Sequence, residues 1–202
     1  MRFEFLVEET SMEAFLEAWL RRFLPDTCAF SIHPFQGKQD LLKKLEHRLK
    51  GYAKWLPPDH RIVLVVDRDD QDCLDLKGRL EAACEASGLR SKSNDLENDW
   101  QVTIRIVIEE LEAWYFGDWE AVLAVYPRVP ENIPKRAPFR DPDNISGGTW
   151  ERFERILQIC GYHDGGLQKV RAAQQIGAHI DVERSTSASF LHLANVLYEV
   201  AA

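Results

Sequence analysis

The chain has 202 residues, of which 45% are hydrophobic and 29% are charged, and its net charge is −8. This composition is typical of one globular domain, or of one domain with a smaller addition. The negative charge argues against a protein whose whole surface binds nucleic acid. The sequence contains no run of about 18 apolar residues, so we expect no membrane span.

The N-terminal residues and the cysteines favour a cytoplasmic protein. The chain begins with a strand-like segment that contains Glu4, Glu8 and Glu9, which is unlike a signal peptide. Its four cysteines form neither a Cys-x-x-Cys pair nor a zinc-binding spacing. Small buried thiols in a reducing compartment are the simplest interpretation.

Strand-like and helix-like segments alternate through the first half of the chain, which predicts an α/β fold. Apolar, β-branched residues predict strands at 3–7, 28–33, 61–66 and 101–108. Helical periodicity predicts helices between Ser11 and Pro25, at 38–54, at 72–87 and again from Glu109 to Trp114. We therefore expect an open, mainly parallel four-stranded sheet that is flanked by helices.

The second half of the chain predicts a helical extension. Residues 127–149 are rich in proline and glycine and predict a long loop, which follows an α/β core at 1–126. Residues 150–202 predict a C-terminal helical segment that packs on this core. Its helices are expected near 150–160, 166–177 and 186–200.

Three of the predicted strands end in clusters of carboxylates. Ligands of open parallel sheets bind outside the carboxyl ends of the strands. Carboxylates that converge there would repel one another, and a hard divalent cation such as Mg²⁺ or Mn²⁺ would remove that repulsion. The clusters are Glu8-Glu9, Asp67-Arg68-Asp69-Asp70 and Glu109-Glu110-Leu111-Glu112.

The spacing of Asp67 and Asp69 favours a shared cation. Alternate residues that leave a strand point to the same side, so both carboxylates can face one ion, and Glu8 becomes a third candidate ligand. In the other interpretation, Asp69, Asp70 and Asp72 cap the following helix and oppose its dipole. The two interpretations are compatible with each other.

The third cluster begins a predicted helix. Glu109 and Glu112 are three residues apart, so both carboxylates can lie on the same helical face and point to the same ion or reacting group. Acidic residues in a first helical turn also serve the helix dipole, which is the simpler role for at least one of them. Trp114 and Trp119 are expected in the core or in an interface.

A basic stripe lies on the predicted helix at 38–54. Lys43, His47, Lys50 and Lys54 share one helical face, which is typical of the solvated side of an amphipathic helix. The stripe could also hold phosphates that approach the acidic crevice, together with Lys38. Gly37-Lys38 lacks the rest of a phosphate-binding loop.

The order of these motifs resembles the Toprim fold of topoisomerases, primases and overcoming-lysogenization-defect nucleases. The sequence is also similar to a family of uncharacterised bacterial proteins, DUF4276, in segments that span most of the chain. These segments are Leu6-Val7-Glu8-Glu9-Thr10-Ser11-Met12-Glu13, Val63–Asp72, Ile108-Glu109-Glu110-Leu111-Glu112-Ala113-Trp114 and Ser187-Ala188-Ser189-Phe190.

The resemblance implies a Mg²⁺-binding Toprim-like core with phosphodiester chemistry, in phage defence beside an ATPase. By position, Glu8 matches the Toprim glutamate, and Asp67 and Asp69 match its aspartates. The chain departs from the pattern at Glu9, where many Toprim proteins have glycine. A residue with a side chain at this position hinders the close approach of a phosphate to the backbone.

Our preferred hypothesis is a metal-dependent nuclease or a related phosphoryl-transfer enzyme. Glu8, Asp67 and Asp69 would hold Mg²⁺ or Mn²⁺, and Lys38, Lys43 and Lys50 would bind phosphate. A second ion or the general base would come from Glu9, Asp70, Glu109 or Glu112. One alternative is a non-catalytic metal- or nucleotide-binding module that partners an ATPase, and an aromatic Trp114–Trp119 surface would favour it. The other alternative is a phosphate-receiver domain with Asp67 as the acceptor.

Overall fold

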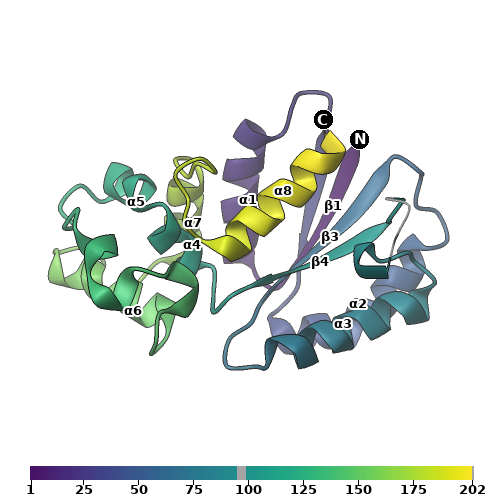
Figure 1. Ribbon diagram of the computed structural model, residues 1–202, viewed down its shortest axis with the longest axis horizontal. Coiled ribbons are helices and arrows are strands. Elements are labelled where there is room, and N and C mark those ends of the chain that lie inside the picture. The colour runs from purple at the N-terminus through teal and green to yellow at the C-terminus, as the bar shows by residue number, and fades with distance from the viewer. Residues whose placement is uncertain (95–98, 202) are drawn as a thin grey trace.

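The computed structural model describes residues 1–94 and 99–201, and its centre is an all-parallel sheet (Figure 1). The four strands lie in the order β2-β1-β3-β4. This arrangement confirms the predicted α/β class with a four-stranded sheet. The strands are β1 (Arg2–Val7), β2 (Ala29–Pro34), β3 (His60–Asp67) and β4 (Val102–Val107).

Helices connect the strands and follow the last one. The predicted helices of the first half are present as α1 (Thr10–Phe23), α2 (Lys38–Tyr52) and α3 (Cys73–Ser87). After β4 come α4 (Glu112–Gly117), α5 (Trp119–Val125), α6 (Thr149–Ile159), α7 (Lys169–Gly177) and α8 (Ala188–Ala201). Short 3₁₀ helices are η1 (Lys92–Asn94), η2 (Ile133–Lys135), η3 (Ala137–Phe139) and η4 (Pro142–Asn144).

Both faces of the sheet are covered, as a parallel sheet requires. Side chains alternate along each strand, so Phe5 and Val7 face one layer of helices and Leu6 faces the other. Figure 1 shows α1 and α8 on one side of the sheet and α2 and α3 on the other. The strands, which have apolar residues on both faces, are therefore buried almost continuously.

The bounds of α3 follow from its end residues. Asp72 caps the first turn, because its carboxylate accepts hydrogen bonds from Leu74 N at 2.9 Å and Asp75 N at 3.0 Å. Gly88 ends the helix in the left-handed region, with φ of 80°. The helix agrees with the one predicted at 72–87, and Asp72 has the capping role that the sequence allowed.

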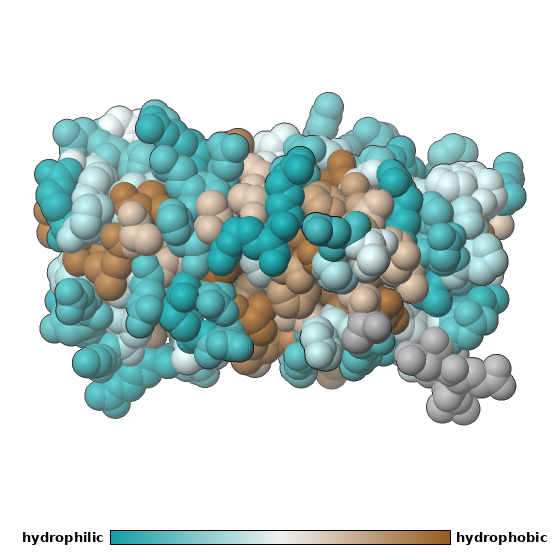
Figure 2. Space-filling model, turned by 90° about the horizontal axis from the view of Figure 1, so that it is seen from above, coloured by the Kyte–Doolittle hydropathy of each residue, from teal (hydrophilic) through white to brown (hydrophobic). Residues whose placement is uncertain are grey.

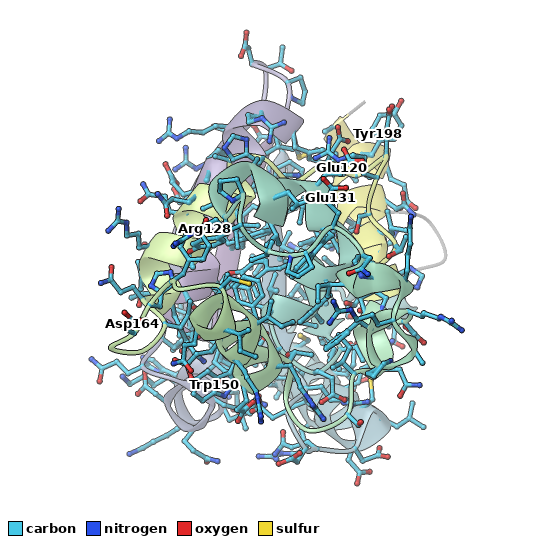
Figure 3. All side chains as sticks on the ribbon, turned by 90° about the vertical axis from the view of Figure 1, so that its left-hand side faces the viewer. Glu120, Arg128, Glu131, Trp150, Asp164 and Tyr198 are labelled. Carbon is cyan, nitrogen blue, oxygen red and sulfur yellow. The ribbon has the colours of Figure 1, made fainter. Side chains whose placement is uncertain are left out.

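Helices α4 to α7 form the end of the molecule towards which the strands point (Figures 1 and 3). Side chains from this end share one hydrophobic core with the α1 face of the sheet, among them Phe153 and Ile176. Helix α7 lies very close to α1, where Gly177 faces the backbone of Phe15. The segment 127–149 is joined to the start of α8 by Asp143, whose carboxylate accepts from Ser187 Oγ at 2.7 Å and from Ser189 N at 2.8 Å.

None of the helices in the described part of the chain combines the length and the hydrophobicity that a membrane crossing demands. Seen from above, the surface mixes hydrophilic residues with hydrophobic ones (Figure 2).

One local prediction after β4 was wrong, and one helix was not predicted. The predicted helix at Glu109 begins only at Glu112, because Glu109 adopts a left-handed conformation with φ of 64°. Glu109 and Glu112 therefore do not share a helical face. Helix α5 was not predicted, and the segment 127–149 contains three short 3₁₀ helices within the expected loop.

Candidate functional site

The carboxyl edge of the sheet brings several acidic side chains together. Glu8 follows β1, Asp67 ends β3, and these strands are hydrogen-bonded neighbours. Glu112 enters from the first turn of α4 and is 4% exposed, while Asp67 is 8% exposed. The charges of Glu8 and Glu112 both act on Asp67, so the three carboxyls form one acidic cluster.

Lys38 supplies a positive charge to this acidic cluster. The loop before α2 passes beside the end of β1, where Gly37 N donates to the backbone oxygen of Glu8 at 3.0 Å. This contact turns the first residue of α2 inwards, and the Lys38 side chain is 8% exposed. Its ammonium forms an ion pair with Asp69 and lies 4.0 Å from Glu8 Oε2. Lys38 therefore lies in the site, bound to carboxylates.

Burial makes the carboxyl groups of the cluster hard to ionise. Desolvation raises the pKa of Asp67 well above its ordinary value, and repulsion from Glu8 and Glu112 adds to this rise. Burial likewise raises the pKa of Glu8 to about 7, although the positive charge of Lys38 opposes it. The pKa of Glu112 also rises to about 7 through burial, opposed by Lys169. Burial and mutual repulsion therefore favour the protonated form of these carboxyls.

Two oxygens of the acidic cluster are buried without a hydrogen-bond partner among the described residues. They are Glu8 Oε2 and Asp67 Oδ1. Most buried polar atoms in proteins have a hydrogen-bond partner, so these two oxygens are exceptions. Carboxylate oxygens are the donors that Mg²⁺ and Mn²⁺ prefer, so the chemistry of these residues fits such an ion.

The loops after β3 and β4 are fixed to each other. Asp69 N donates to Glu109 O at 3.0 Å, and the side chains of Arg68 and Glu109 form an ion pair. Asp69 and Glu109 are both in the left-handed region, with φ of 50° and 64°. Non-glycine residues in this region are uncommon, and they often occur at functional sites. Arg68 neutralises Glu109, which separates Glu109 from the acidic cluster.

The other predicted site residues lie around the acidic cluster or outside it. Glu9 precedes α1, and its carboxylate accepts a hydrogen bond from Ser11 Oγ. Asp70 is exposed. Lys43 and Lys50 are exposed on α2, and Lys50 forms an ion pair with Glu46. The structure thus brings Glu8, Asp67, Asp69, Glu112 and Lys38 together and leaves Asp70, Lys43 and Lys50 on the surface.

Glu110 has a structural contact that the sequence did not predict. Its carboxylate accepts from Thr149 Oγ1 at 2.9 Å and from Trp150 N at 3.0 Å, so it caps α6. Trp114 and Trp119 are 0% and 5% exposed, which places them in the core. An aromatic Trp114–Trp119 surface for a partner protein is therefore absent from the structure.

Two further residues near the acidic cluster were missed in the sequence. Lys169, at the start of α7, lowers the pKa of Glu112, and its ammonium lies 4.6 Å from the ring centroid of Trp150. Tyr115 is 1% exposed, and its hydroxyl pKa is raised by burial and by the charges of Glu112 and Asp67. Lys169 comes from a helix that meets the sheet edge only in the folded chain, so no local motif marks it. Tyr115 directly follows the segment 108–114, but nothing in the local pattern marks its hydroxyl.

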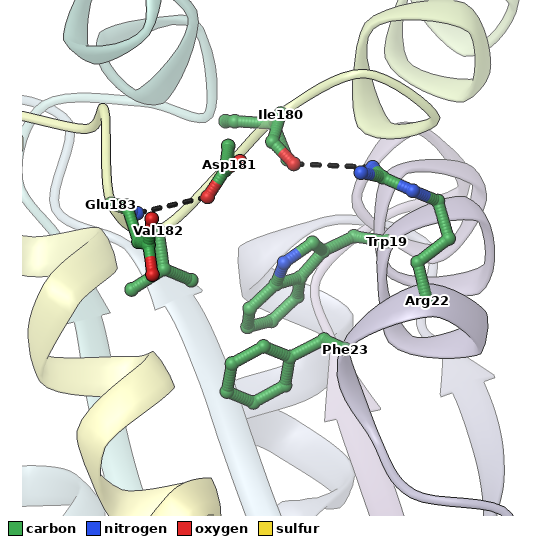
Figure 4. A pocket seen from close by; sticks show the side chains of 7 residues that line it. All are labelled: Trp19, Arg22, Phe23, Ile180, Asp181, Val182 and Glu183. Atoms are coloured by element: carbon green, nitrogen blue, oxygen red, sulfur yellow. Dashed lines mark hydrogen bonds between the residues drawn. The ribbon is translucent and has the colours of Figure 1, made fainter.

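A separate cavity of about 480 Å³ lies between α1 and the segment 180–183 (Figure 4). Its polar groups bind one another: Arg22 donates to the backbone oxygen of Ile180 at 3.2 Å, and Glu183 N donates to Asp181 at 2.9 Å. The first of these contacts joins the segment after α7 to α1, and the second lies within that segment, so both have a structural role.

The fold and the site define an α/β protein with an open parallel sheet and a buried acidic cluster at its carboxyl edge. Among the residues described, no three His, Cys, Asp or Glu side chains are already arranged to hold a metal ion. The chain belongs to the family described as "Domain of unknown function (DUF4276)", which matches residues 7–198. No curated protein and no solved structure matches the chain.

Proposed function

We propose that this protein is a Mg²⁺- or Mn²⁺-dependent phosphoryl-transfer enzyme of the nuclease type, with a Toprim-like core, in phage defence. The observation that carries the proposal is a pair of buried oxygens, Glu8 Oε2 and Asp67 Oδ1, which have no hydrogen-bond partner among the described residues and lie at the carboxyl edge of the sheet. Ligand sites of open α/β sheets occur at this edge. Removing charged groups from water is costly unless an opposite charge compensates, and a divalent cation would do so.

Glu8 and Asp67 are the residues that would hold the ion, and Asp69 would join them on release from Lys38. Bound there, the ion would polarise a phosphodiester and lower the pKa of a water molecule. Lys38, released in turn from Asp69, would bind a phosphate oxygen through its ammonium. Lys38 would thus be the partner of Asp69 before the ion binds and the partner of phosphate afterwards.

Glu112 is the candidate general base. A base works best when its pKa lies near the working pH, and the pKa of Glu112 is about 7. In hydrolysis, the water oxygen would form a bond to phosphorus, the leaving oxygen would depart with the bonding electrons, and Glu112 would accept the proton of the water. The charge of Glu112 already acts on Asp67, which places it beside the proposed ligands.

The test is cleavage of single- and double-stranded DNA and RNA with Mg²⁺ or Mn²⁺. We expect the wild-type protein to cut at least one of these substrates, and Asp67→Asn to reduce the rate by at least about a hundredfold. Glu131→Gln, which changes an exposed carboxylate, serves as the control. Circular dichroism checks that both variants fold. Intact substrates with both metals present would count against the nuclease.

The second candidate is a non-catalytic module that binds a cation or a nucleotide and docks on an ATPase. One observation favours it: Lys38 already compensates part of the negative charge through Asp69. In that case Asp67→Asn should leave the biological function of the complex intact. Loss of that function together with loss of cleavage would select the enzyme.

A further inference from the structure

A second cavity, of about 450 Å³, lies at the edge of the sheet where β2 and the C-terminal end of α2 meet. Arg2, Glu4, His33, Arg48, Tyr52 and Trp55 are among the residues that line it. It shares no residue with the acidic cluster. Glu4 precedes Glu8 by four residues on β1, so the two sites are separated by roughly 13 Å along the strand.

The charge of the cavity is positive. Glu4 is buried, and it accepts hydrogen bonds from Arg2 Nε at 2.9 Å and from the His33 ring at 2.7 Å. Arg2 is also held by Ser31 Oγ at 2.6 Å. Glu4 also accepts a hydrogen bond from the Tyr52 hydroxyl at 3.4 Å. The cavity thus holds two arginines and one carboxylate, which leaves it with a positive charge. Arg48 makes no ion pair with the residues described; its guanidinium lies 5.8 Å from the centroid of the Tyr52 ring.

The cavity also presents an exposed aromatic face. Trp55 is 57% exposed, whereas Trp19, Trp100 and Trp114 are at most 2% exposed. Its ring centroid lies 5.3 Å from that of Tyr52, but the Tyr52 side chain is buried and its ring is tilted by 40° against that of Trp55. Trp55 therefore supplies the exposed ring of the cavity. The hydrophobic core does not require an exposed tryptophan here. A flat ring next to a guanidinium is the arrangement that stacks a nucleobase and binds its phosphate.

We propose that this cavity binds one nucleotide unit, with the base stacked on Trp55 and the phosphate bound by Arg48 and Arg2. The unit belongs either to a free nucleotide or to a single strand of nucleic acid, since the chemistry is the same. The inference goes beyond the proposed catalytic function, because it needs no metal and no cleavage.

The experiment measures binding in EDTA, where metal-dependent cleavage does not occur. The probes are fluorescein-labelled single-stranded DNA of mixed sequence, followed by anisotropy, and adenosine monophosphate, followed by calorimetry. Inorganic phosphate is the competitor. We expect Trp55→Ala to weaken binding about tenfold and Trp55→Phe to retain most of it. Arg48→Ala should weaken binding and make it less sensitive to salt.

Tyr198→Ala is the matched control, because Tyr198 is an aromatic residue that is 69% exposed on α8, outside the cavity (Figure 3). If adenosine monophosphate binds as tightly as the single-stranded DNA, the result supports a free nucleotide as the occupant. If the single-stranded DNA binds more tightly, the result supports nucleic acid. Equal binding by wild type and Trp55→Ala overturns the inference, as does absence of binding to either probe. Competition by phosphate as strong as that by the monophosphate also overturns it.

The outcome is independent of the proposed catalytic function. Cleavage with Mn²⁺ by a protein whose Trp55→Ala variant binds normally would remove only this inference. Binding that depends on Trp55 in a protein without cleavage would remove only the proposed nuclease.

Discussion

Replacement of Glu112 by glutamine tests whether burial and repulsion govern the acidic cluster. The pKa of Glu112 is raised from 4.5 to about 7. One pKa unit corresponds to about 1.4 kcal/mol, so ionised Glu112 lowers the folding stability by about 3 kcal/mol at pH 8.5. Glutamine has nearly the same shape and no charge, and it should remove this cost.

The sign of the pH dependence follows from the protons. Between pH 4.5 and about 7, unfolded Glu112 has lost its proton while folded Glu112 retains it. The free energy of unfolding of the wild-type protein therefore falls as pH rises through this window. Glu112→Gln should exceed wild type by about 2 to 3 kcal/mol at pH 8.5, and by less than about 1 kcal/mol at pH 5.

Urea unfolding in EDTA at both pH values measures this difference. In a chain of this length, the change at pH 8.5 corresponds to a rise in Tm of about 5–10 °C. Glu131→Gln, at an exposed carboxylate, should show no such gain at either pH. A gain that is equal at pH 5 and pH 8.5, or a loss at both, would refute the electrostatic reasoning.

Three other predictions concern the ion, the lysine and the packing of α7. Scanning calorimetry should show that Mn²⁺ raises the Tm of the wild-type protein more at pH 8 than at pH 6, because the ion competes with protons for the carboxylates. The Asp67→Asn variant should show no such rise in Tm. Lys38→Met removes the positive charge beside the carboxylates, so in EDTA at pH 8 it should lower the free energy of unfolding by about 1–3 kcal/mol. In a separate titration without EDTA, calorimetry should show that this variant binds Mn²⁺ more tightly than wild type, and weaker binding would contradict the reasoning. Gly177→Ala should lower the free energy of unfolding, measured by thermal unfolding, by about 1–3 kcal/mol, because the added Cβ would lie 2.7 Å from Phe15 O. Gly78→Ala is the control: its Cβ would meet no atom within 4 Å, so it should raise the free energy of unfolding by about 0.5–1 kcal/mol.

The sheet and its connecting helices could be predicted because their information is local. Period-two and helical patterns are properties of short segments, and Asp72 and Gly88 mark the ends of α3 by their own conformational preferences. The meeting of Glu8 and Asp67 followed from one topological rule about parallel sheets. To apply that rule, one needs to know only where each strand ends, and the sequence pattern shows these positions.

The rest of the site depends on contacts between segments far apart in the chain. Glu109 looks like the first residue of a helix, but its backbone oxygen binds Asp69 N and its carboxylate binds Arg68. Lys169 approaches Glu112 only because α7 packs on α1. Such tertiary contacts override local propensity, and one sequence does not reveal them.

Lys38 illustrates how such a contact changes the chemistry of the site. Its ammonium carries a single positive charge, and it lies between Asp69 and the acidic cluster of Glu8, Asp67 and Glu112. Lys38 and Lys169 do not compensate all of these carboxylates, and burial favours the protonated form of the buried ones. The raised pKa values of Glu8, Asp67 and Glu112 express this preference. A divalent cation would displace those protons and loosen the hold of Asp69 on Lys38. Binding of the cation would thus bring the ligands together, leave Glu112 free to act as a base and release Lys38 to bind phosphate. Because protons and the cation compete for the same carboxylates, metal affinity must be measured as a function of pH.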